Sequence, residues 1–126
     1  MVRLKGIVIT GIGDFSYRME NVPGLLEAYE KITGMRFFPG TLNVKLKKEF
    51  SFPKKIMRLE KEKYGFQVSV NILQCKINGK KAFILRTDAN ERGVGNHPNT
   101  IIEIASNIKL RDKFNLKDGD EVIIEI

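Results

Sequence analysis

The Asn78-Gly79 pair constrains the fold of this chain most, because it joins two strand-like runs through a two-residue turn. Asn-Gly is the strongest short signal for a β-hairpin, since both central residues of the tight turn need a positive φ. The run before the pair covers residues 66–77, and the run after it covers residues 80–87. We therefore expect two long antiparallel strands.

Shorter apolar runs indicate further strands, and one segment has the periodicity of a helix. In residues 25–32 the apolar side chains recur at helical spacing, with Pro23 near the start and Gly34 as a C-terminal stop. Many short strands, one main helix and glycine-containing turns predict a mainly β fold, a small closed β-barrel with an inserted α-helix. The other expected elements are strands at 4–10, 41–46, 101–104 and 121–126, an irregular segment at 50–63, a long loop at 88–100 and a short helix at 110–114.

The composition limits the class of protein. A chain of 126 residues with 42% hydrophobic content fits one domain, 1–126, with a real core. It has no apolar run long enough to span a bilayer and no signal peptide, so we expect a cytoplasmic protein without a membrane partner. The single cysteine, Cys75, excludes an internal disulfide and is expected to be buried. His97 has no second His or Cys nearby, which argues against zinc.

The stretch Gly40-Thr41-Leu42-Asn43-Val44 places a hydroxyl and an amide oxygen two residues apart at the start of an expected strand. Side chains alternate along a strand, so Thr41 and Asn43 are expected to project from the same face. Two neutral oxygen ligands suit a hard cation such as Mg²⁺, which keeps most of its waters and bridges to phosphates. A Gly-Thr step that opens a strand is also common for steric reasons alone.

Three other segments could complete a phosphoryl-transfer site, and each also has an ordinary structural interpretation. Residues 11–16 form a glycine-containing loop whose N–H groups could bind a phosphate, or simply a turn after a strand. Glu103, within an apolar run, either points outward from an edge strand or lies in a pocket, where it could act as a general base. Lys109 and Arg111 offer positive charges to a nucleotide, or belong to a solvated amphipathic turn.

Taken together, these segments resemble the archaeal CTP-dependent riboflavin kinases. The resemblance implies a closed six-stranded cradle-loop β-barrel, related to the RIFT barrels. It also implies transfer of the γ-phosphoryl group of CTP to the 5′-hydroxyl of riboflavin, which gives FMN and CDP. The matching segments, in chain order, are Gly6-Ile7-Val8, Gly11-Ile12-Gly13, residues 29–34, Gly40-Thr41-Leu42-Asn43, and residues 101–104, 109–111 and 114–120.

Carried over by position, the resemblance implies that Thr41 and Asn43 hold Mg²⁺ and that Glu103 is the catalytic residue. The family loop often has a glycine where this chain has Phe15. The implied flavin-binding residues are Asn96, His97, Asn99 and Glu103. The implied nucleotide-binding residues are Gly11, Ile12, Gly13, Asp14, Phe15, Ser16, Ile108, Lys109, Leu110 and Arg111.

The net charge of +7 leaves other classes open. Related cradle-loop barrels include DNA-binding regulators, and a basic surface would serve a nucleic-acid-binding barrel without catalysis equally well. However, the basic residues form no stripe interleaved with aromatic residues, so we expect no nucleic-acid partner. The mixed charges at residues 54–63 are interpreted as a solvated face. A flavin carrier without catalysis is a third alternative, but it has no need of the Thr41–Asn43 pair. A monomer is favoured.

Overall fold

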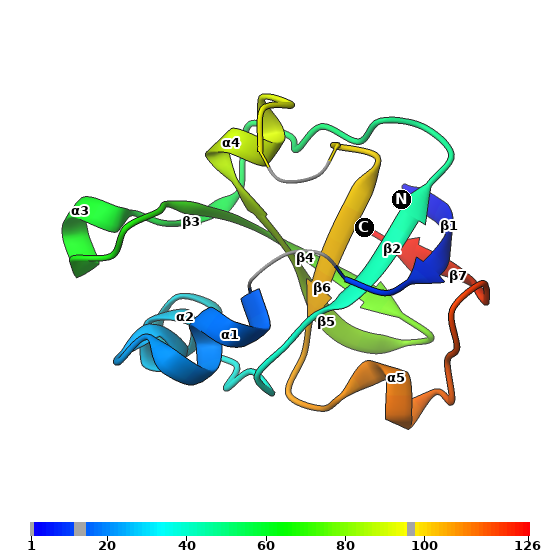
Figure 1. Ribbon diagram of the computed structural model, residues 1–126, viewed down its shortest axis with the longest axis horizontal. Helices are drawn as coiled ribbons and strands as arrows, with labels where there is room; N and C mark the ends of the chain where they lie inside the picture. The colour runs from blue at the N-terminus through cyan, green and yellow to red at the C-terminus, as the bar shows by residue number, and fades with distance from the viewer. Residues whose placement is uncertain (1, 12–14, 96–97) are drawn as a thin grey trace.

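The computed structural model describes residues 2–11, 15–95 and 98–126, and its centre is an antiparallel β-barrel (Figure 1). Six strands form a closed ring in the order β4-β5-β6-β2-β1-β7, because β7 pairs back with β4. The short strand β3 lies outside the ring and pairs with β4. The predicted mainly β fold with a closed six-stranded barrel is confirmed. The strands are β1 (Arg3–Ile9), β2 (Leu42–Leu46), β3 (Met57–Leu59), β4 (Val70–Ile77), β5 (Lys80–Thr87), β6 (Ile101–Ala105) and β7 (Glu121–Glu125).

The β4–β5 hairpin forms at the predicted turn. Asn78 and Gly79 have φ values of 49° and 76°, as this tight turn requires. The strand β4 begins at Val70, later than the predicted residue 66, because the preceding residues cap a helix. The backbone N–H of Phe66 donates to the carbonyl of Lys61, which closes the C-terminus of the one-turn helix α3 (Lys61–Tyr64).

The barrel separates two apolar clusters. One fills the interior of the ring and includes Val44, Ile84 and Ile104, all fully buried. The other lies between the barrel and the helices and includes Tyr29 and Phe83. Successive side chains of a strand point to opposite faces, so Phe83 and Ile84 of β5 serve different clusters. Cys75 is buried as expected, and burial raises the pKa of its thiol to about 12.

The insertion between β1 and β2 contains two helices, whereas the sequence predicted one. The first, α1 (Phe15–Asn21), starts within the predicted glycine-containing loop, because Phe15 and Met19 are one turn apart and both are buried. The second, α2 (Leu25–Thr33), begins two residues after the expected Pro23 and ends at Gly34, as predicted.

Two more one-turn helices lie at the ends of the barrel (Figure 1). The helix α5 (Leu110–Lys113) confirms the predicted short helix. The helix α4 (Asp88–Glu91) occupies the start of the segment predicted as a long loop. Its N-terminus is capped by Thr87, whose hydroxyl accepts a hydrogen bond from the N–H of Asn90. Within the part of the chain that the structure describes, no helix is long and apolar enough to cross a membrane.

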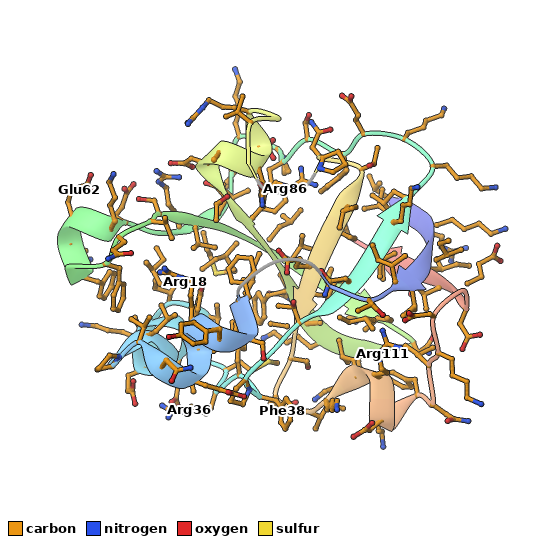
Figure 2. The ribbon with its side chains drawn as sticks, viewed as in Figure 1. Arg18, Arg36, Phe38, Glu62, Arg86 and Arg111 are labelled. Carbon is orange, nitrogen blue, oxygen red and sulfur yellow. The ribbon has the colours of Figure 1, made fainter. Side chains whose placement is uncertain are left out.

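Arg86, on β5, holds the loops at one end of the barrel together (Figure 2). Its side chain is 1% exposed and forms an ion pair with Glu91 of α4 at 2.8 Å. Its guanidinium also donates to the carbonyl of Phe50 and, at 3.0 Å, to the carbonyl of Asn99. A buried guanidinium needs several acceptors, so these contacts fix three separate segments to one side chain.

Candidate functional site

A cavity of about 570 Å³ lies beside the paired strands β2 and β6, and we call it the Thr41 cavity. It is bounded by the start of α1, the segment before β2, the end of β6 and the start of α5. Segments that are far apart in the sequence therefore meet here. The sequence-predicted residues that line it are Gly11, Ser16, Thr41, Asn43, Glu103, Ile108, Lys109, Leu110 and Arg111.

Three predicted residues, Thr41, Asn43 and Glu103, form a connected group in this cavity. The pairing register of β2 and β6 places Asn43 opposite Glu103. The hydroxyl of Thr41 donates a hydrogen bond to Oε1 of Glu103 at 3.1 Å. Glu103 is 3% exposed on a strand with neighbours on both sides, so the alternative of an outward-pointing edge residue is wrong.

Asn43 presents a buried oxygen to this group. The residue is 7% exposed, and its amide nitrogen donates to the carbonyl of Thr41 at 3.4 Å. Its Oδ1 accepts no hydrogen bond from the residues that the structure describes. A buried acceptor without a partner costs about 1–3 kcal/mol. Because hard cations prefer neutral and anionic oxygen ligands, the oxygens of Asn43, Thr41 and Glu103 fit such an ion.

Gly11 lies directly against the Asn43 amide. A Cβ atom at Gly11 would lie 2.3 Å from Nδ2 of Asn43, closer than two such atoms can approach. The glycine therefore allows the backbone that follows β1 to reach the amide group. The sequence predicted that glycines in this loop let the backbone approach a phosphate, and what Gly11 approaches in the structure is the side chain of Asn43.

Arg111 is held in place by residues that sequence reasoning missed. It forms an ion pair with Asp118 at 2.9 Å and donates to the carbonyl of Ile9 at 3.2 Å. Asp118 also accepts a hydrogen bond from the hydroxyl of Thr10. The Thr10 hydroxyl and the Arg111 guanidinium together hold the pKa of Asp118 below its usual range. The sequence indicated only a turn around Asp118, and its partner Thr10 is 108 residues away along the chain.

A second cavity, of about 400 Å³, is also lined by Glu103, and we call it the Asp88 cavity. One wall comes from the segment between α3 and β4, and the other from α4. Arg18 and Phe15 of α1 complete it, and Figure 2 shows Arg18 on the side of α1 that faces β3. Glu103 lines both cavities, which makes this carboxylate the point at which they meet. The cavity is also lined by Lys61, Ser69, Thr87, Asp88, Asn90 and Arg92.

The remaining predicted residues are distributed differently. Phe15, predicted to bind the nucleotide, lines the Asp88 cavity and packs into the helical cluster instead. Asn99, predicted to contact the flavin, lines neither cavity, and its carbonyl accepts hydrogen bonds from Arg86 and from the N–H of Phe50. The predicted residues Ile12, Gly13, Asp14, Asn96 and His97 lie outside the described residues.

Two lining residues of the Thr41 cavity had no signal in the sequence. Phe38 is 43% exposed at the edge of this cavity, and its N–H donates to the carbonyl of Ser106 at 2.8 Å. Phe38 and Arg111 lie on the same side of the molecule, near α5 (Figure 2). Ser106 is buried, and its hydroxyl donates to the carbonyl of Lys81. Only the fold brings residues from β2, β6 and α5 together in this way.

Known proteins are similar in sequence to almost the whole chain. A family model named for CTP-dependent riboflavin kinases, and described as domain of unknown function DUF120, matches residues 8–126. The riboflavin kinase of Thermofilum pendens is 30% identical over 132 aligned residues, which cover 98% of this chain and 58% of that protein. The riboflavin kinase of Archaeoglobus fulgidus is 31% identical, with 99% of this chain and 54% of that protein covered.

The same pattern extends to other archaea. The riboflavin kinase of Pyrobaculum aerophilum is 32% identical over 99% of this chain and 60% of its own length. The chain thus spans between 54% and 60% of the length of these three relatives. The family model begins within β1 and covers every later strand and helix, together with all the residues that line the two cavities. This chain therefore belongs to the family of archaeal CTP-dependent riboflavin kinases.

Proposed function

We propose that this chain phosphorylates riboflavin with CTP as the phosphate donor and forms FMN and CDP. The observation that carries the proposal is the position of Glu103, which lines both cavities. Phosphoryl transfer depends mainly on holding donor and acceptor in line on either side of the migrating group. The names of the relatives supply riboflavin as the acceptor, and the name of the family supplies CTP as the donor.

The Thr41 cavity would hold the nucleotide. Lys109 and Arg111 bring positive charge to it, and the ion pair with Asp118 fixes the guanidinium. The Asn43 oxygen, which has no hydrogen-bond partner among the described residues, and the hydroxyl of Thr41 would hold Mg²⁺. Mg²⁺ bound there would neutralise charge on the β- and γ-phosphates.

The Asp88 cavity would hold riboflavin with its ribityl chain directed toward Glu103. Its volume of about 400 Å³ is suited to a small organic molecule. In the reaction, a bond forms between the 5′-oxygen of riboflavin and the γ-phosphorus of CTP, and the bond from that phosphorus to the bridging oxygen of CDP breaks. Glu103 accepts the proton of the 5′-hydroxyl or orients that hydroxyl for attack.

A direct assay tests this proposal. Purified protein is incubated with riboflavin and one nucleotide at a time (CTP, ATP, GTP or UTP), and FMN is separated by chromatography. The expected result is FMN formation with CTP. Riboflavin binding without any FMN would favour a flavin carrier. Tight DNA binding that weakens steeply with salt, again without FMN, would favour the nucleic-acid-binding barrel.

Substitution of Gly11 by alanine tests the Asn43 position. The added methyl group would overlap the Asn43 amide at 2.3 Å and force it to move. We expect the affinity for Mg²⁺ and nucleotide to fall by about tenfold or more, as when a group that orients a metal ligand is changed. The measurement is calorimetric titration with CDP at several Mg²⁺ concentrations.

The matched control for this variant is Gly34→Ala. Gly34 has a φ of 79° with nothing within 4 Å of an added Cβ, so this variant carries backbone strain without a steric clash. It is expected to lose stability but to keep its nucleotide affinity. Equal affinity losses in the two variants would show that general destabilisation, and not the Asn43 amide, explains the effect.

A further inference from the structure

We infer that Arg58 is a positioning residue for the acceptor substrate, because it fastens the two walls of the Asp88 cavity to each other. This inference rests on the proposed function and concerns how the cavity keeps its affinity for the flavin. One wall belongs to an arm made of β3, α3 and the residues before β4, which projects from the barrel (Figure 1). The strand β3 pairs with β4, and the β4–β5 ladder ends at Val70 opposite Thr87, so backbone pairing joins the two walls only at their base. Beyond this point, side chains such as Arg58 hold the arm against α4.

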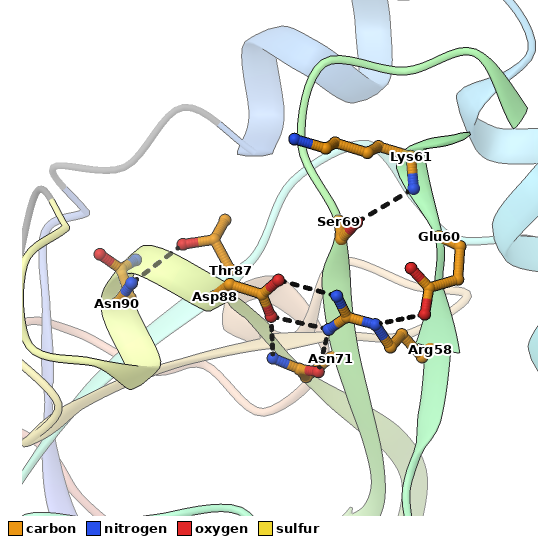
Figure 3. A network of polar contacts seen from close by, with 8 residues as sticks. All are labelled: Arg58, Glu60, Lys61, Ser69, Asn71, Thr87, Asp88 and Asn90. Atoms are coloured by element: carbon orange, nitrogen blue, oxygen red, sulfur yellow. Dashed lines mark hydrogen bonds and ion pairs between the residues drawn. The ribbon is translucent and has the colours of Figure 1, made fainter. Parts of the chain in front are cut away.

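The contacts of Arg58 bridge the arm, the barrel and α4 (Figure 3). Its two terminal nitrogens, Nη1 and Nη2, donate to the two carboxylate oxygens of Asp88, each at 2.7 Å. Nη1 also donates to Oδ1 of Asn71 at 2.7 Å, and Nε pairs with Glu60 at 2.6 Å. The amide of Asn71 donates in turn to Asp88 at 3.0 Å. A planar guanidinium can serve three partners in this fixed geometry, whereas an ammonium group cannot.

Asp88 connects Arg58 to the wall of the cavity that α4 forms. It is the first residue of α4, and the residues Thr87, Asp88 and Asn90 all line the cavity. On the opposite wall, the N–H of Lys61 donates to the hydroxyl of Ser69 at 3.0 Å, which keeps α3 against the start of β4. Each wall is thus ordered internally, and the Arg58–Asp88 pair joins the two.

The Arg58–Asp88 pair also determines how much negative charge lines the cavity where a molecule would bind. The hydrogen bonds from Arg58 hold the pKa of Asp88 below its usual range, so the carboxylate is charged at neutral pH. With Arg58 present, this charge is paired with a guanidinium that does not itself line the cavity. Without it, the Asp88 carboxylate would line the cavity without its ion-pair partner, and would keep the hydrogen bond from Asn71 and the charge of Arg92. An uncharged ring system that displaces water from such a carboxylate binds less well.

The test is the affinity of the purified chain for riboflavin, measured through quenching of flavin fluorescence. In Arg58→Gln we expect binding to weaken by roughly tenfold, as when groups that support a binding site are removed. The affinity for Mg²⁺ and CDP, which occupy the other cavity, is expected to stay unchanged, and kcat at saturating riboflavin is expected to change far less than KM for riboflavin. Arg58→Lys keeps the positive charge but loses the planar guanidinium. Its affinity for riboflavin should therefore lie between those of the unmodified protein and Arg58→Gln.

The matched control is Arg36→Gln, which also removes an arginine paired with two carboxylates. Arg36 contacts Glu27 and Glu30 at 3.3 Å and 3.6 Å on the surface of α2, and it lines neither cavity. Unchanged riboflavin affinity in Arg58→Gln and Arg58→Lys, at a temperature where both are folded, would overturn the inference even if their Tm values fell. Equal losses of affinity for riboflavin and for nucleotide in Arg58→Gln would also overturn the inference. If the unmodified protein binds no riboflavin, the proposed function fails, and the inference fails with it.

Discussion

Replacement of Glu103 by glutamine is expected to lower the turnover of riboflavin by about 100-fold or more, the size of effect that loss of a general base produces. Glutamine has the same length, and its carbonyl oxygen can still accept the hydrogen bond that Thr41 donates to Glu103 at 3.1 Å. The fold and the walls of both cavities should therefore persist, while the ability to accept a proton is lost. The measurement is kcat from FMN formation, with riboflavin affinity determined separately.

Two comparisons make this experiment specific. Glu62→Gln removes an exposed carboxylate on α3 and should leave both kcat and affinity unchanged. Riboflavin affinity in Glu103→Gln should remain close to that of the unmodified protein, because the substitution preserves the shape of the cavity. A near-normal kcat would remove Glu103 from the proposed role. A large loss of affinity with the same kcat would make it a binding residue only.

The double substitution Thr41→Ala and Asn43→Ala is expected to abolish the increase in rate that Mg²⁺ produces. These side chains offer a hydroxyl that contacts Glu103 and a buried amide oxygen that accepts no hydrogen bond from the part of the chain that the structure describes. Mg²⁺ is held by few protein oxygens together with substrate phosphates, so the loss should be visible when nucleotide is present. The rate is measured against Mg²⁺ concentration, and binding of Mn²⁺ in the presence of CDP is followed by electron paramagnetic resonance.

A matched double variant, Thr33→Ala with Asn21→Ala, removes the same two side-chain types from the helical insertion. Thr33 and Asn21 donate to carbonyls one turn earlier in their own helices, and they line neither cavity. This control should keep its response to Mg²⁺ and its binding of Mn²⁺. If Mn²⁺ binding in the Thr41/Asn43 variant is normal, these two residues are not the metal ligands.

The parts of the fold that the sequence predicted are those whose backbone conformation is determined by residues close together in the chain. The Asn78-Gly79 turn fixes its own backbone angles, and Gly34 ends α2 through a positive φ of 79°. The helix α1 was missed because only Phe15 and Met19 give it an apolar face, and both follow a glycine-containing segment. Whether Phe15 is buried depends on the helical cluster it packs into, which the local pattern cannot show.

The sequence predicted which residue types belong to the candidate site, but it did not predict how they are arranged in space. The spacing of Thr41 and Asn43 follows from the alternation along a strand. The direction of Glu103 was left open, because it depends on whether β6 is an edge strand, and that is decided by its pairing with β2 and β5. Register between strands distant in sequence is set by the closed barrel.

The Asp88 cavity shows most clearly what a single sequence conceals. The mixed charges at residues 54–63 were interpreted as a solvated face, and for Arg58 this interpretation is wrong. Its side chain is 32% exposed, and its main partner, Asp88, is 30 residues away along the chain. A charge run gives no signal of a distant partner, so only the fold reveals that Arg58 joins two walls.

A crystal structure of this protein with riboflavin, CDP and Mg²⁺ would show whether Glu103 stands between the phosphate donor and the acceptor. The expected result is CDP in the Thr41 cavity and riboflavin in the Asp88 cavity, with the 5′-hydroxyl beside Glu103 and the metal on Thr41 and Asn43. If both ligands occupy the same cavity, or if the flavin binds away from Glu103, this carboxylate does not stand between donor and acceptor, and the proposed reaction is contradicted.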